Sequence, residues 1–306
     1  MSAPPISPRA AALKPSTPSS PIPTMDSQRG DAALSAEIVS IEGSLPTGMS
    51  RILILGGTTE ARELAERLAK RTDFEVIVSL AGRTKSPAPQ PVPVRRGGFG
   101  GAAGLANYLR NERIDVIVDA THPYANIISA NAAASARHAG VPLIVLRRPP
   151  WRAVAGDRWI EAGDVADAVR RLGERPRRVF VTLGRTELEP LTAAPQHLYL
   201  IRSVDPVEPP LPLPRVSYVT DRGPFSAADD RTLMSAHAID AVIAKNSGGA
   251  ASYGKIAAAR ALGIEVIMLR RPAPSDAPAV ETVDEVIAWL DHAIASARAR
   301  GIQRGV

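Results

Sequence analysis

Short apolar runs alternate with stretches of helical periodicity along most of this chain. The first run covers residues 52–55, and Ala61, Leu64, Ala65 and Leu68 then recur at the three- and four-residue spacing of a helix. Comparable apolar runs occupy residues 74–80, 114–120 and 141–146, and an edge-like run with prolines covers 91–97. Strands that alternate with helices over short connections predict a parallel sheet with helices on both faces.

The segment RRPPW at residues 147–151 interrupts this pattern, and a second strand–helix alternation follows it. That alternation ends in a helix expected from Val283 onward. The pattern predicts an α/β fold of two Rossmann-like domains with parallel sheets and a cleft between them, where a ligand would bind. We place a nucleotide-binding domain at residues 50–148, and a second α/β domain that contributes the substrate site at residues 149–306.

Residues 1–49 differ from the rest of the chain. Seven prolines and five serines fall within the first 25 residues, without apolar periodicity or a signal-peptide core. This composition predicts a disordered Pro/Ser/Ala-rich tail. Met25 and Met49 are alternative starts, so the tail can also be an artefact of the assigned start site.

The composition excludes several kinds of chemistry. The chain contains no cysteine, which rules out disulfides, thiolate catalysis and cysteine-bound zinc. No apolar run approaches the ~20 residues of a transmembrane helix, and no His/Asp/Glu cluster has the spacing of metal ligands. We therefore expect a cytoplasmic protein without a metal or a membrane span.

The positive charge of the chain is dispersed. The net charge is +6, and the arginines lie near the ends of expected strands without forming a dense basic stripe. Nucleic-acid binding favours such a stripe with interleaved aromatic residues. A small anionic ligand fits this distribution better.

The loop after the first strand resembles a G-x-G-x-x-G/A dinucleotide fingerprint in which threonine replaces the second glycine. A threonine at position 58 or 59 can cap the following helix, and the free N–H groups of the helix start form an anion site. The alternative is a strand–turn–helix that needs glycine only for its turn. The candidate cofactor residues of this loop are Gly56, Gly57, Thr58, Thr59 and Glu60.

The end of the second strand bears on the choice of cofactor. NAD-binding chains usually carry Asp or Glu there, which binds the ribose 2′-hydroxyl. This chain has Arg83 and Thr84 and no acid in that stretch. A guanidinium suits a 2′-phosphate, so the stretch favours NADP over NAD.

The segment DATHPYA, residues 119–125, follows another strand and places polar groups where a nicotinamide would lie. His122 can act as a proton donor, hydrogen-bond the cofactor, or cap a helix that Pro123 begins. Thr121 and Tyr124 lie beside it in the sequence. Neither a Tyr-x-x-x-Lys pair nor a G-x-S-x-G elbow occurs in the chain.

Residues 249–256, GAASYGKI, nearly match a nucleotide-hydrolysis loop. Ile256 stands where such a loop needs a magnesium-binding hydroxyl, which argues against hydrolysis. The preceding residues AKNSGG end a strand next to a helix start. They form a second anion-ready site around Lys245, Asn246 and Ser247.

Together these segments resemble the precorrin-6A reductase family of cobalamin biosynthesis. The similarity rests on an ordered set that extends from about residue 51 to residue 272. The matching segments are ILILGGTTEARELA, SLAGRT, DATHPYA, RRPPW, RGPF, AKNSGG and EVIMLRRP.

The resemblance implies an NADPH-dependent reductase that delivers a hydride to one C=C bond of the precorrin-6A macrocycle, with a proton added at the adjacent carbon to give precorrin-6B. It places NADPH at residues 56–60 with Arg83 and Thr84, and the nicotinamide near Thr121, His122 and Tyr124. His122 and Tyr124 are the candidate catalytic residues, although we expect no single indispensable acid. The residues expected to face the anionic tetrapyrrole are Arg222, Gly223, Pro224, Phe225, Lys245, Asn246, Ser247, Gly248 and Gly249.

Two alternatives stay open at this point. One is a cobalt-precorrin-6A reductase, which performs the same chemistry on a ring that already contains cobalt. The other is a non-enzymatic NADP-sensing regulator, which would bind NADPH without oxidising it.

Overall fold

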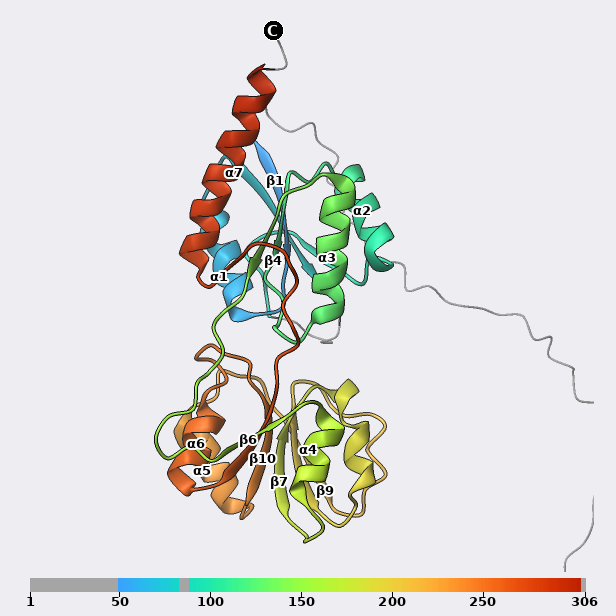
Figure 1. Cartoon of the computed structure of the whole chain (residues 1–306), viewed down its shortest axis with the longest axis vertical. Helices are drawn as coiled ribbons and strands as arrows, with labels where there is room; N and C mark the ends of the chain where they lie inside the picture. Colours follow the sequence, from blue (N-terminus) through green and yellow to red (C-terminus); the bar gives the residue numbers. More distant parts are fainter. Residues whose placement is uncertain (1–48, 83–87, 304–306) are drawn as a thin grey trace, which may run out of the picture. The chain divides into compact units, whose positions relative to one another are not determined.

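The computed structural model describes residues 49–82 and 88–303. The predicted N-terminal tail, apart from residue 49, lies outside these residues, as do Arg83 and Thr84. The described chain contains two six-stranded sheets, and every strand pair in them is parallel (Figure 1). The predicted α/β fold with two parallel sheets is confirmed.

The first sheet has the strand order β12-β5-β4-β1-β2-β3. Its strands are β1 (Ser50–Leu55), β2 (Phe74–Leu80), β3 (Val94–Arg96), β4 (Val116–Asp119), β5 (Leu143–Leu146) and β12 (Ala279–Val280). All six residues of β1 are buried, as a central strand covered on both faces requires. The proline-containing run expected as an edge strand forms β3 at the edge of this sheet.

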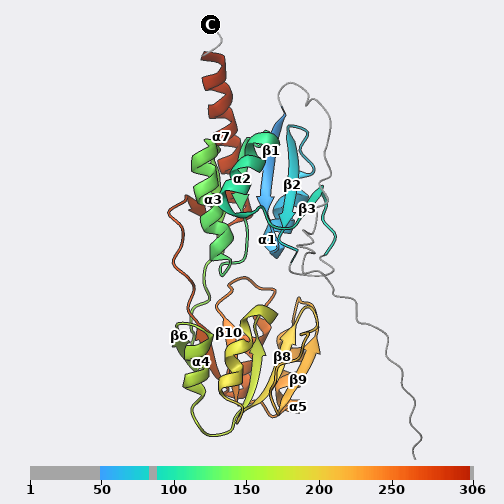
Figure 2. The same cartoon turned by 90° about the vertical axis from the view of Figure 1, so that its right-hand side faces the viewer.

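Helices cover both faces of the first sheet (Figures 1 and 2). The core on one face combines strand residues with α1 (Thr59–Leu68) and α7 (Val283–Gln303). The core on the other face contains residues of α2 (Gly101–Asn111) and α3 (Asn126–Ala139). Ser135 of α3 donates a hydrogen bond of 2.7 Å to the Ala102 carbonyl of α2, which ties these two helices together.

The second sheet has the order β6-β11-β10-β7-β8-β9. Its strands are β6 (Trp159–Ala162), β7 (Arg178–Thr182), β8 (Leu198–Ser203), β9 (Val216–Thr220), β10 (Ala241–Lys245) and β11 (Glu265–Leu269). One face packs against α5 (Ala227–Ala236) and α6 (Gly254–Leu262). The other packs against α4 (Val165–Leu172) and the 3₁₀ turn η2 (Glu189–Ala193), which follows the 3₁₀ turn η1 (Arg185–Glu187).

The two sheets share one layout except for the origin of the outermost strand. In the first sheet that strand is β12, which follows all strands of the second sheet in the sequence. In the second sheet it is β6, which precedes the other strands of that sheet in the sequence. The C-terminal segment therefore returns to the first sheet. The expected second domain at residues 149–306 included this segment, whereas β12 pairs with β5 and the apolar face of α7 joins the first core. Apolar periodicity predicts a helix but not the sheet on which it packs.

Two helices begin later than expected. α3 starts at Asn126, so Pro123 lies outside its first turn, and the Ala125 amide instead donates to the His122 carbonyl at 2.7 Å. α6 starts at Gly254, although the helical pattern of the sequence predicts a helix over Ala250–Leu262. In both cases the preceding loop residues are engaged in contacts with distant parts of the chain, which a local pattern does not reveal.

The role of α7 in the first core can be tested with Leu290, which is 0% exposed. Replacing Leu290 with Ala removes apolar contacts and leaves a cavity, and should lower the free energy of unfolding by about 2–5 kcal/mol. Urea denaturation followed by circular dichroism measures this change. The exposed neighbour His292, changed to Ala, is the matched control; equal effects of the two substitutions would contradict the packing of α7.

Candidate functional site

Most of the polar residues singled out in the sequence lie at the carboxyl ends of central strands. In each sheet the strand order reverses between two neighbours, β1 and β4 in the first and β7 and β10 in the second. Loops after two such strands run in opposite directions and leave a crevice between them, where ligands bind in open α/β sheets. Residues 56–60 form the loop after β1 and the start of α1, residues 120–125 form the loop after β4, and residues 246–253 form the loop after β10.

The loop after β1 is built as an anion site. Gly57 has φ +116°, a left-handed conformation that favours glycine, and no atom lies within 4 Å of where a Cβ would be. Thr58 caps α1, because its hydroxyl oxygen accepts a hydrogen bond from the Ala61 amide at 3.1 Å. The next amides before Ala61, those of Thr59 and Glu60, have no acceptor among the described residues, so they can bind an anion.

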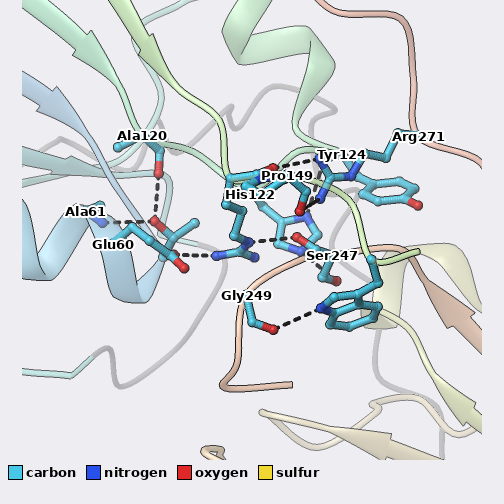
Figure 3. A network of polar contacts seen from close by, with 12 residues as sticks. Glu60, Ala61, Ala120, His122, Tyr124, Pro149, Ser247, Gly249 and Arg271 are labelled. Carbon is cyan, nitrogen blue, oxygen red and sulfur yellow. Dashed lines mark hydrogen bonds and ion pairs between the residues drawn. The ribbon is translucent and has the colours of Figure 1, made fainter. Parts of the chain in front are cut away.

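The Thr58 hydroxyl proton already takes part in a hydrogen bond within the protein. It is donated to the Ala120 carbonyl at 2.8 Å, which fastens the loop after β1 to the end of β4 (Figure 3). Thr58 therefore replaces the second fingerprint glycine as a capping and bridging residue. Contact with a phosphate would fall to the backbone amides rather than to this side chain.

Glu60 and Arg148 form an ion pair across this part of the site (Figure 3). Arg148 also donates from Nε to the Ser247 carbonyl at 2.7 Å. The guanidinium thus joins the start of α1 to the loop after β10. Glu60, expected to contact the cofactor, has its carboxylate paired within the protein.

His122 is a neutral bridging residue in this structure. Its Nδ1 accepts a hydrogen bond from the Tyr124 amide at 3.3 Å, so the ring proton lies on Nε2 and is donated to Ser247 Oγ at 3.1 Å. Burial, followed by the positive charges of Arg148 and Lys245, lowers the pKa of His122 to about 3. A neutral imidazole results at any ordinary pH.

Tyr124 joins the two sheets' loops through its hydroxyl. The hydroxyl donates to the Leu269 carbonyl at 2.5 Å and accepts from the Asn246 amide at 2.8 Å. Burial raises the pKa of Tyr124 to about 12. The phenol is therefore protonated, and its proton is held by a carbonyl.

Thr121 and Asp119 lie at the end of β4. Asp119 Oδ1 accepts hydrogen bonds from the Thr121 hydroxyl at 2.6 Å and from its amide at 3.1 Å. The other carboxylate oxygen is buried and has no hydrogen-bond partner among the described residues. Thr121 thus contacts a carboxylate in the interior, beside the expected nicotinamide position.

Lys245, expected to bind a substrate carboxylate, is paired with Glu187 of η1. Its ammonium group also lies 5.0 Å from the centroid of the Tyr124 ring. Sequence reasoning missed Glu187. The available signal was its place three residues after Gly184, whose amide donates to the Glu187 carboxylate at 3.2 Å in the manner of a helix cap.

Asn246 holds Trp151, the last residue of the segment RRPPW, through both ends of its side-chain amide. Oδ1 accepts from the Trp151 amide at 2.7 Å, and Nδ2 donates to the Trp151 carbonyl at 2.9 Å. The same close packing explains why positions 248 and 249 are glycines. A Cβ on Gly248 would lie 2.3 Å from the Pro149 carbonyl oxygen, and one on Gly249 would lie 3.0 Å from a Glu60 carboxylate oxygen.

Arg271 is a second residue that sequence reasoning left without a role. It donates to the carbonyls of Asn246 at 2.7 Å and Arg148 at 2.8 Å. It also donates to the Pro149 carbonyl at 3.2 Å (Figure 3). Burial lowers the pKa of Arg271. Arg148, Lys245 and Arg271 together give the surroundings of His122 a positive potential, which favours an anionic ligand.

The segment RGPF lies in the loop after β9. The Phe225 amide donates to the Ala251 carbonyl at 3.2 Å, which joins this segment to the loop after β10. Arg222 and Gly223 are exposed, and Pro224 lies between Gly223 and Phe225. The structure thus brings the RGPF segment to the loop that contains residues 246–253.

Two kinds of feature are absent from the residues that the structure describes. Within them no group of three or more His, Asp or Glu side chains could hold a metal ion. Among the helices described, none is both long and apolar enough to cross a membrane.

Comparisons with known proteins identify relatives of this chain. The family model described as "Precorrin-6x reductase CbiJ/CobK" matches residues 51–291. The precorrin-6A reductase of Sinorhizobium sp is 56% identical over 247 residues, which cover 81% of this chain and 95% of the relative. The precorrin-6A reductase of Rhodobacter capsulatus is 49% identical and covers 80% and 97% respectively. A solved structure named CobK precorrin-6A reductase is 48% identical, with a TM-score of 0.78 over 80% of this chain and 97% of the other.

The protonation state of His122 can be measured directly. Its folded pKa of about 3 lies below the unperturbed value of about 6.5, so the unfolded chain binds a proton between these values and the folded chain does not. His122 therefore makes the fold less stable as the pH falls from about 6.5 toward 3. We expect its imidazole NMR signals, assigned with His122→Asn, to stay unchanged down to pH 5. We also expect His122→Asn to lose less stability on acidification than the wild type. A His122 midpoint near 6.5 would contradict this account.

Proposed function

The chain belongs to the precorrin-6x reductase family, and from that premise we propose how its own residues serve the reaction. It is an oxidoreductase of cobalamin biosynthesis that reduces a C=C bond of the precorrin-6A macrocycle to give precorrin-6B. The resemblance drawn from the sequence motifs is confirmed. Its enzymatic relatives leave no support for the regulator that senses NADP without oxidising it.

Members of this family use NADH or NADPH as the hydride donor, and we propose that this chain uses NADPH. The residues of this chain fit a dinucleotide at the loop after β1, where Gly57 leaves open space and the first amides of α1 are available. The reduced nicotinamide supplies the hydride when it is bound. The preference for NADPH rests on Arg83 and Thr84, whose role is proposed from the sequence alone.

The observation that carries the site proposal is the hydrogen bond between His122 and Ser247. It joins a loop at the β1/β4 reversal of the first sheet to a loop at the β7/β10 reversal of the second. We propose that the nicotinamide lies beside Thr121, His122 and Tyr124, and that the macrocycle lies against residues 222–225 and 245–249. A hydride acceptor held there would be close to the donor.

Electrostatics supports the choice of an anionic substrate. Arg148, Lys245 and Arg271 surround a neutral imidazole, and two of the three cations are matched by Glu60 and Glu187. We propose that a carboxylate arm of the tetrapyrrole competes with Glu187 for Lys245.

The hollow lined by Trp151, Asn246 and Arg271 among others has a volume of about 290 Å³. This lies at the lower limit for a small-ligand pocket, too small to enclose the macrocycle.

Neither candidate catalytic residue is poised to deliver a proton. The imidazole is neutral with its one N–H on Ser247, and the phenol proton is held by the Leu269 carbonyl. We propose that they position the reactants, and that the carbon takes its proton from water or from a substrate carboxyl group. Positioning then supplies most of the rate.

We propose the metal-free macrocycle over the cobalt-containing one, because the relatives at 49% and 56% identity are precorrin-6A reductases. The absence of cysteine from the chain supports a cytoplasmic location as a further proposal. We also propose that residues 50–148 bind the cofactor and that the second sheet contributes the substrate contacts.

Turnover with each nicotinamide tests the cofactor proposal. Protein mixed with precorrin-6A and NADPH should lose absorbance at the nicotinamide band, and NADH should be much poorer. Arg83→Ser should lower kcat/KM for NADPH about tenfold or more and leave NADH unchanged, since a charged hydrogen bond is worth about 1.5–3 kcal/mol. Arg110→Gln, at an exposed residue of α2, is the control. Equal use of both cofactors by the wild type would overturn the NADPH preference.

Variants of the two candidate catalytic residues test the proton proposal. His122→Asn and Tyr124→Phe should each keep measurable turnover, with losses of about ten- to a hundredfold from disturbed positioning rather than from a missing acid. Stopped-flow measurement of NADPH oxidation at saturating substrate gives these rates. If either variant bound both ligands normally and showed no turnover at all, an indispensable side-chain acid would be established.

A further inference from the structure

Three ionisable side chains lie together between the second sheet and its helices α5 and α6, outside the site described above. Arg202 is in β8, Asp230 in α5 and Lys255 in α6, and they are 7%, 1% and 5% exposed. Charged residues are almost never buried this deeply unless they are paired. The reaction proposed above gives none of them a role.

Arg202 connects the cluster to the RGPF segment. Its Nη1 donates to Asp230 Oδ1 at 2.5 Å, and its guanidinium lies 3.6 Å from the centroid of the Phe225 ring. A guanidinium that faces an aromatic ring at this distance is attracted by the ring's electrons. One flat group therefore holds both the start of α5 and the last residue of RGPF.

Lys255 connects the cluster to the loop before α6. Its Nζ donates to the Ser252 carbonyl at 2.7 Å and lies 5.3 Å from the centroid of the Trp151 ring. The second oxygen of Asp230, Oδ2, is buried without a hydrogen-bond partner among the described residues. Its negative charge nevertheless favours the protonated form of Lys255.

Gly254 completes the contact between the two loops. A Cβ at this position would lie 2.5 Å from the Phe225 carbonyl oxygen and 2.9 Å from Asp230 Oδ2. Glycine is thus required because α6 starts directly against RGPF and α5. This explains the near match to a nucleotide-hydrolysis loop at residues 249–256: Gly254 makes a close approach, and Lys255 points into the core.

We propose that Arg202, Asp230 and Lys255 are positioning residues that hold the RGPF segment against residues 250–254 in the arrangement that receives the tetrapyrrole. This inference rests on the proposed substrate site at residues 222–225 and 245–249. Well-packed apolar residues often match or exceed a buried ion pair in stability, so the ionic groups need another reason to be present. That reason is geometry, because a buried charge is satisfied in few arrangements.

The protonation of Lys255 provides a readout. Burial, followed by the positive charge of Arg202, lowers the pKa of Lys255 to about 8, while Asp230 acts in the opposite direction. These are the charged groups of β8 and α5 that face it. The lysine loses its charge as the pH rises through about 8, and the hold on the two loops weakens there.

Steady-state kinetics and hydrogen exchange test the proposal in the full-length enzyme. Lys255→Met and Arg202→Met should raise KM for precorrin-6A about tenfold while kcat and the Kd for NADPH change less than about twofold. KM of the wild type should rise above pH 8, and that rise should be absent in Lys255→Met. Arg231→Gln, next to Asp230 on the exposed side of α5, should match the wild type.

Arg202→Lys covers the case in which a methionine variant fails to fold. It keeps a cation opposite Asp230 but removes the flat group over Phe225, and should raise KM about threefold. Hydrogen exchange is independent of substrate. In each folded cluster variant the Phe225 amide, which donates to Ala251, should exchange faster than in Arg231→Gln.

The outcomes separate this inference from the proposed function. Unchanged exchange at Phe225 in the folded variants would overturn the positioning role, whatever the enzyme does with precorrin-6A. Faster exchange with unchanged KM would overturn the link to substrate. Proportional changes in KM, kcat and NADPH affinity would indicate general loosening and also overturn it. A wild-type enzyme without turnover would instead refute the proposed reaction, and the exchange result would still decide the role of the cluster.

Discussion

Burial of parallel strands on both faces is the constraint on which the rest of this structure depends. β1, β4 and β10 are apolar almost throughout, and helices cover both faces of each sheet. Polar chemistry therefore has few places except the strand ends and the loops that follow them. The two reversals of strand order select two such edges, and the residues that can bind ions, donate protons or cap helices gather there.

The balance of charge at these edges follows from the same constraint. Arg148, Lys245 and Arg271 lie near His122, and burial keeps that imidazole neutral. Glu60 and Glu187 pair with two of the cations, while Arg271 has backbone carbonyl partners. Pairing limits the cost of burying charge, and the remaining positive potential suits a substrate with several carboxylates.

Local patterns succeeded where both partners are close in the sequence. The Thr58 cap of α1, the glycine turn before it and the strand–helix alternation could all be read from a few neighbouring residues. Glu187 and Arg271 were missed because their partners are distant: Glu187 contacts Lys245, and Arg271 contacts Asn246 and Arg148. Distance along the chain also hid the hydrogen bonds of the Tyr124 hydroxyl. Its partners are Asn246 and Leu269, which follow it by 122 and 145 positions.

The pattern of residues along the chain was enough to predict the class of fold and, through an ordered set of motifs, the family, and it points to the loops at the strand ends where we propose the site. These follow from periodicity and turn chemistry, which act over a few residues. Three features emerge only in the folded chain: β12 and α7 join the first sheet and its core, Lys255 points into the core, and the glycines of KNSGG leave room for the segment RRPPW. Each of these depends on atoms brought together from distant parts of the chain, and packing in three dimensions alone determines which of them meet.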